Sequence, residues 1–104
     1  MDAHTIDILG KKEDGSLELV IVMDKMIDDS PAEQKVLLDK IENYMGYVDS
    51  KDFKVDFPNV SKDAVEIRLL MPNSPSEEFV QWLGSIKSWV EENGLKFRVT
   101  TSSH

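Results

Sequence analysis

Apolar and polar positions alternate in several short runs of the chain, a period that is typical of strands. The runs 5–10 and 17–23 are separated by Asp14-Gly15, a pair that suits a tight turn, so we expect them to form an antiparallel hairpin. Further alternating runs follow at 53–57, 65–71 and 95–99. The pattern therefore predicts five strands.

Two other segments have the helical period, and nearly the same four residues precede each of them. Ser30-Pro31 and Ser74-Pro75 each place a capping serine before a proline, and a glutamate follows at the spacing of a capping box. We expect one helix after Ser30 that ends near 48–50, and another after Ser74 that ends at Asn93-Gly94. Their expected core-facing residues are Leu37, Leu38, Ile41, Tyr44, Met45 and Val48 in the first helix, and Phe79, Leu83, Ile86 and Val90 in the second.

The two halves of the chain correspond, each as a strand, a helix and a strand. This order predicts a single α+β domain, residues 1–104, in which two helices cover one face of a mainly antiparallel five-stranded sheet. The predicted order β-β-α-β-β-α-β is a ferredoxin-like core with an extra N-terminal strand, and residues 100–104 are expected to fray. The sequence leaves open the strand order and the position of the N-terminal strand.

Composition and charge narrow the classes of function. The 104 residues include 20 Asp and Glu against 12 Lys and Arg, a formal net charge of −8, so nucleic acid and anionic membrane are not expected partners. No apolar run is long enough to span a membrane and the first residues lack the pattern of a signal peptide, which predicts a cytoplasmic protein. The chain contains no cysteine, which excludes disulfides, thiolate nucleophiles and Cys-ligated metals.

Few residues have the spacing of catalytic or metal-binding chemistry. His104 is the final residue and a poor candidate for a general base, so His4, at the start of the first predicted strand, is the one histidine that could serve. The acidic loop lacks the glycine of a Ca²⁺ loop, and its carboxylates also suit the positive end of the following helix. The carboxylates in question are Asp24, Asp28, Asp29 and Glu33. We therefore predict no enzyme, no catalytic residue, no metal and no cofactor.

Two surfaces are candidates for binding a partner. Val20, Val22 and Leu70 would form an apolar patch rimmed by charge on the sheet face away from the helices, which suggests self-association or a protein partner; a small patch tolerated on a monomer is the alternative. Trp82 and Trp89 share one side of the second helix, where they either anchor a ligand or partner or close the rim of the core. Alternation places Glu18, Val20, Val22, Lys54, Asp56, Glu66, Arg68, Leu70, Lys96 and Arg98 on the sheet face.

Three stretches of the chain together resemble a family of small bacterial proteins of unknown function. They are IDILG at 6–10, LLDKIENYMGYV at 37–48 and PSEEFVQWLGSIKSWVEENGLKFRV at 75–99. The resemblance covers about residues 6–99 and implies a bacterial origin. It brings no activity, cofactor or catalytic residue.

The sequence as a whole favours a non-enzymatic module for protein–protein interaction, with a protein partner or a second copy of the chain as its ligand. One alternative is a small-ligand-binding regulatory domain, by analogy with other ferredoxin-like domains. Another is an immunity or antitoxin-like protein whose acidic surface meets a basic toxin.

Overall fold

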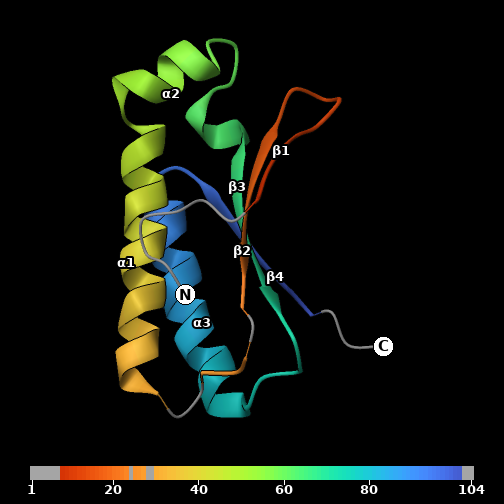
Figure 1. Ribbon diagram of the computed structural model, residues 1–104, viewed down its shortest axis with the longest axis vertical. Coiled ribbons are helices and arrows are strands. Elements are labelled where there is room, and N and C mark those ends of the chain that lie inside the picture. The colour runs from red at the N-terminus through yellow and green to blue at the C-terminus, as the bar shows by residue number, and fades with distance from the viewer. Residues whose placement is uncertain (1–7, 24, 28–29, 102–104) are drawn as a thin grey trace.

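The computed structural model describes residues 8–23, 25–27 and 30–101, which form two layers. Helices α1 and α3 lie side by side on one face of the sheet, and α2 lies beyond the C-terminal end of α1 (Figure 1). The elements are, in chain order, β1 (Ile8–Lys11), β2 (Leu17–Val22), α1 (Pro31–Val48), α2 (Lys51–Asp56), a 3₁₀ turn (Lys62–Ala64), β3 (Val65–Met71), α3 (Glu77–Glu92) and β4 (Lys96–Thr101). The predicted α+β class with helices on one face is confirmed.

The sheet is mixed, and its four strands stand in chain order, β1-β2-β3-β4. β1 and β2 form the predicted hairpin around a turn in which Gly15 has a φ of 88° and Asp14 accepts hydrogen bonds from the N–H and hydroxyl of Ser16. β2 pairs with β3, and β3 with β4, in parallel. Two right-handed crossovers in the same direction place both long helices on the same face.

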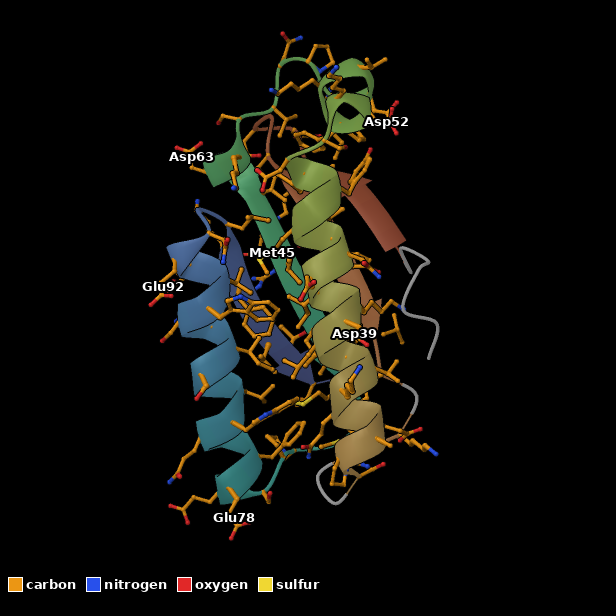
Figure 2. All side chains as sticks on the ribbon, turned by 90° about the vertical axis from the view of Figure 1, so that its left-hand side faces the viewer. Asp39, Met45, Asp52, Asp63, Glu78 and Glu92 are labelled. Carbon is orange, nitrogen blue, oxygen red and sulfur yellow. The ribbon has the colours of Figure 1, made fainter. Side chains whose placement is uncertain are left out.

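The core lies between the helices and the sheet. In β3 the alternate residues Val65, Ile67, Leu69 and Met71 are buried, and the strand bounds agree with those predicted. Both predicted helical stripes are confirmed, since every member is buried except Leu38, which is partly buried against the core. Figure 2 shows the acidic side chains Glu78 and Glu92 projecting from the outer side of α3, away from this core.

The strand predicted at 53–57 is wrong, because this segment forms the short helix α2. Ser50 caps the helix by accepting a hydrogen bond from the N–H of Phe53 at 3.3 Å. The apparent alternation concealed an i, i+4 pair: Phe53 is buried with its ring 5.6 Å from that of Phe57, whereas Val55 between them is exposed. Apolar residues at every second position fit a strand. They also fit one side of a helix when the middle residue is exposed, because residues i and i+4 lie on the same side of a helix.

This correction changes the sheet. The described chain contains four strands, so neither the five-stranded sheet nor the ferredoxin-like order is confirmed, and two of its three strand pairings are parallel rather than antiparallel. The N-terminal strand is at an edge beside β2. β4 continues past the predicted end at 99, with Thr100 and Thr101 in register with Leu70 and Met71, and residues 102–104 lie outside the described part of the chain.

The two helix starts differ from the predicted capping boxes. Ser30 is the N-cap of α1 and Pro31 follows it, as predicted, but the Ser30 side chain makes no capping hydrogen bond. α3 begins later than predicted: its N-cap is Ser76, whose hydroxyl accepts a hydrogen bond from the N–H of Phe79 at 3.2 Å. Ser74 lies outside the helix.

Replacing Ser76 by alanine should lower the free energy of unfolding by about 1 kcal/mol, because the N–H of Phe79 loses its acceptor at the helix start. Ser74→Ala, two residues earlier, is the matched control and should change stability by less than about 0.5 kcal/mol. Urea unfolding followed by tryptophan fluorescence measures both. Equal losses, or a larger loss for Ser74→Ala, would contradict the assignment of the cap.

Tyr47 holds the end of α1 to α2. Its hydroxyl donates a hydrogen bond to Asp56 Oδ2 at 2.8 Å, and its ring meets that of Phe53 edge-on at 5.5 Å. Desolvation, followed by the hydrogen bond to Asp56 and the negative charges of Asp56 and Asp52, raises the pKa of Tyr47 to about 12. The neutral phenol is therefore the form that the fold stabilises.

Replacing Asp56 by asparagine should lower the pKa of Tyr47, because the amide removes the negative charge that opposes ionisation of the phenol. Since the folded pKa is raised, the stabilising contribution of Tyr47 is complete below its ordinary value of 10.0 and is lost as the pH rises through about 12. Titration of phenolate ultraviolet absorbance measures the shift. Asp52→Asn is the control with a smaller decrease; equal decreases would show that the hydrogen bond has no part in the shift.

Candidate functional site

Among the described residues, the structure forms no site from the candidates for metal binding and acid–base chemistry. Asp24, Asp28 and Asp29, like the terminal histidines His4 and His104, lie outside the described residues. Within the described ranges, no three His, Cys, Asp or Glu side chains are grouped so that they could hold a metal ion. Glu33 forms an ion pair with Lys25 instead, at 3.3 Å. None of the described helices combines the length and apolar character needed to cross a membrane.

The sheet face away from α1 and α3, hereafter the open face, brings four candidate residues together. Val20 lies in register beside Arg68, and Val22 beside Leu70. Val20 is only 2% exposed, whereas Val22 is 39% exposed, so the apolar area accessible to a partner is smaller than predicted. Lys54 and Asp56 were expected on this face and belong to α2 instead. The open face consists of Glu18, Val20, Val22, Glu66, Arg68, Leu70, Lys96, Arg98 and Thr100.

Charged side chains, rather than apolar ones, dominate the centre of the open face. Glu18 is surrounded by three cations: Lys12 Nζ at 3.3 Å, Arg98 Nη2 at 3.3 Å and Arg68 Nε at 3.6 Å. Glu66 Oε1 forms a second set of ion pairs, with Arg98 Nε at 3.2 Å and with Lys12 Nζ at 4.0 Å. We call these five residues the charge array.

The charge array is crowded but incompletely hydrogen bonded. The side chain of Glu18 is 13% exposed and that of Arg68 is 29% exposed, so the charges are partly removed from water. Arg68 Nε and Glu66 Oε1 are buried and have no hydrogen-bond partner. Charge attraction holds these groups in place although their hydrogen-bonding geometry is incomplete.

The sign of the open face is opposite to that of the molecule. The charge array and the exposed Lys96 together have four cations and two carboxylates, a surplus of two positive charges. Since the whole chain has a net charge of −8, the rest of it carries −10. Part of that negative charge lies on the helix layer, where Figure 2 labels Asp39, Glu78 and Glu92. The net charge of the chain therefore does not describe the open face, whose described charged side chains have a positive surplus.

Trp82 and Trp89 do not join the open face. Both lie on α3, which covers the other side of the sheet, and both are partly buried and packed against the core. The ring of Trp82 stacks on that of Phe79, with their centroids 5.1 Å apart. The backbone carbonyl of Trp89 accepts a hydrogen bond from Asn93 Nδ2 at 2.8 Å. Their packing favours the interpretation that they close the rim of the core.

Sequence reasoning missed a groove of about 480 Å³ between α3 and β4. It depends on β4 being the edge strand, and no alternation pattern within one strand reports strand order. The exposed Val80 and Gly84 on α3 were the available signal, since both fall outside the buried stripe of that helix. We call this site the edge groove; its main lining residues are Val80, Leu83, Gly84, Lys87, Phe97 and Val99.

Comparisons with known proteins agree with the resemblance seen in the sequence. A family model described as a family of unknown function, DUF6572, matches residues 1–103. Neither the curated proteins nor the solved structures contain a match to the chain.

Replacing Glu18 by glutamine should lower the free energy of unfolding by about 1–2 kcal/mol, because Arg68 loses the carboxylate with which it pairs in a largely buried setting. The loss should shrink in about 1 M salt, where screening weakens the repulsion among the remaining cations. Urea unfolding at low and high salt measures it. Glu42→Gln, on the exposed side of α1, is the control and should be neutral. A neutral Glu18→Gln would mean that the charge array adds nothing to stability.

Proposed function

Since the chain belongs to a family of unknown function, we propose its role from its own surfaces: it is a non-enzymatic protein-interaction module whose open face binds an acidic surface of a partner protein. The supporting observation is the positive charge array on an uncovered sheet face of an acidic protein. The described elements leave this face without a covering layer (Figure 1).

The strand directions support a covered open face. Strands β2, β3 and β4 are parallel, and parallel strands in proteins are almost always covered on both faces. Here α1 and α3 cover one face only. A partner on the open face would supply the second cover that this type of sheet usually has.

The charges favour an acidic partner over a second copy. Two open faces that met across a two-fold axis would bring the surplus cations of one copy, among them Lys96 and Arg98, against those of the other, which costs free energy. Carboxylates of a partner would instead be attracted to the exposed Lys96 and to Arg98, whose side chain is 48% exposed. Val22, with 39% of its surface exposed, supplies apolar contact beside the charges.

The proposed role involves no chemical step. The groups on the open face are guanidinium, ammonium and carboxylate groups that are already paired with one another, and their exchange with groups of a partner changes only which charges are neighbours. Such charge complementarity speeds encounter and selects partners more than it raises affinity.

The proposal is tested by site-specific photo-crosslinking in extracts of the cells that make the protein. A photo-reactive phenylalanine derivative in place of Val22 should cross-link one protein with an acidic docking surface. The same derivative in place of Val55, an exposed valine of α2, should not. Lys96→Glu should reduce the Val22 adduct by about tenfold, as should high salt, because both remove the attraction.

The charge control is Lys51→Glu, which makes the same change of charge on α2 and should leave the adduct unchanged. Adducts of equal yield from Val22 and Val55 would contradict the proposal, as would the absence of any adduct. An adduct with the mass of two copies of this chain would show self-association in place of an acidic partner.

A further inference from the structure

No strand of the described part of the chain lies beside the outer edge of β4. β4 stands last in the sheet and pairs only with β3. Unpaired edges are liabilities that proteins cover or protect, and they are also where extended peptides bind by adding a strand. A site at this edge differs from the proposed function in using the outer backbone of β4 and the side of α3, although it shares Lys96 and Arg98 with the open face.

The pairing pattern shows which backbone groups point outward. The N–H of Met23 donates to the carbonyl of Leu70 at 2.8 Å, so Leu70 directs its backbone groups toward β2. Because direction alternates along a strand, Leu69 directs its groups toward β4 and binds the neighbours of its register partner, Val99. Val99 and Phe97 therefore direct their own N–H and C=O groups away from the sheet. An added strand could form backbone hydrogen bonds with these groups.

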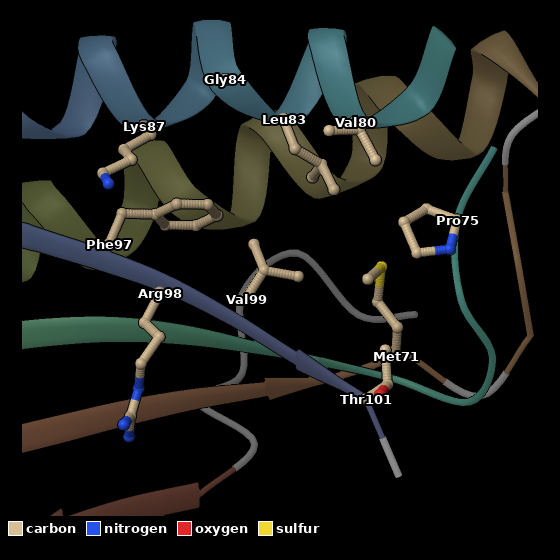
Figure 3. A pocket seen from close by; sticks show the side chains of 10 residues that line it. All are labelled: Met71, Pro75, Val80, Leu83, Gly84, Lys87, Phe97, Arg98, Val99 and Thr101. Atoms are coloured by element: carbon tan, nitrogen blue, oxygen red, sulfur yellow. The ribbon is translucent and has the colours of Figure 1, made fainter. Parts of the chain in front are cut away.

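The edge groove lies directly beside these backbone groups. Phe97 and Val99 point from β4 toward α3, and Leu83 and Val80 point toward them from the helix (Figure 3). Val80 is 51% exposed, and at Gly84 a Cβ atom would meet nothing within 4 Å, so the wall of the groove is open at this point. The groove can take apolar side chains from a strand that pairs with β4.

The two sides of β4 require different side chains in the added strand. Figure 3 shows Arg98 pointing to the opposite face from Phe97 and Val99, and Lys96 shares that opposite face with Arg98 by alternation. On the groove side Lys87 is exposed and forms no ion pair with any described residue. Opposite charges on neighbouring strands stabilise pairing.

We propose that the edge of β4 binds an extended peptide of alternating acidic and apolar residues as a fifth strand. Its apolar side chains enter the edge groove, its carboxylates lie beside Lys96 and Arg98, and its backbone pairs with Phe97 and Val99. A second copy of β4 fits worse, because pairing two such edges would place Lys96 and Arg98 beside their own copies.

Four dye-labelled peptides test the proposal by fluorescence anisotropy against the full chain. The first alternates glutamate and valine and should bind saturably. Replacing its glutamates by serine, or its valines by serine, or methylating the backbone nitrogens that would face β4, should each weaken binding by about tenfold or more. The three changes remove the charge, the apolar contact and the ladder hydrogen bonds separately.

Two glycine variants locate the site. Gly84→Leu should fill the edge groove and weaken binding of the first peptide by about tenfold or more. Gly46→Leu is the matched control and should leave binding unchanged, because Gly46 is also an exposed helical glycine with open space at its Cβ, but on α1. Circular dichroism of both variants should match that of the original chain, since leucine is the better helix former.

The proposal would be overturned by no binding of the first peptide, by equal binding of its N-methylated form, or by binding that Gly84→Leu leaves unchanged. Sedimentation of the chain without peptide tests whether a second copy of the chain occupies the edge instead. A dimer that Gly84→Leu dissociates would assign the edge to a second copy, and would overturn the acidic peptide.

Discussion

The register of β3 between its two parallel neighbours is the constraint on which the rest of the structure depends. Its residues Val65, Ile67, Leu69 and Met71 lie under the helices, while Glu66 and Arg68 lie on the other face between the charges of β2 and β4. A slip by one residue would exchange the two sets and place a carboxylate and a guanidinium in the core. The charge array and the apolar core thus specify the same pairing from opposite sides of the sheet.

Elements whose apolar residues fit only the strand period or only the helix period were predictable from the sequence. A segment whose apolar residues fit both periods was not. The stripe of α3 and the alternation of β3 each fit a single period, and both predictions are confirmed. Phe53, Val55 and Phe57 fit a strand and a helix equally, and the cap at Ser50 decided between them. Sequence patterns also contain no record of which strands are neighbours, so the parallel order and the edge position of β4 required the structure.

The same division applies to the surfaces. Alternation alone was enough to place Val20, Val22, Arg68 and Leu70 on one face. Their burial was not predictable, since Val20 is 2% exposed whereas Val22, on the same strand and face, is 39% exposed. The net charge of −8 was misleading in a similar way, because it is a sum over the whole chain and does not report how the charges are distributed. Two strands that are far apart in the sequence contribute Arg68, Lys96 and Arg98 to one face.

The arrangement of strands in chain order also governs how the protein folds. Residues paired across the hairpin, such as Gly10 and Glu18, are 8 positions apart, those across β3 and β4, such as Glu66 and Lys96, are 30 apart, and those across β2 and β3, such as Leu17 and Val65, are 48 apart. Loop-closure entropy grows with separation, so the pairing of β2 with β3 closes at the largest entropic cost. During synthesis β2 is complete long before β3 leaves the ribosome. The apolar strand Leu17–Val22 therefore spends that interval with one edge unpaired, and this is the period in which the chain is most exposed to aggregation.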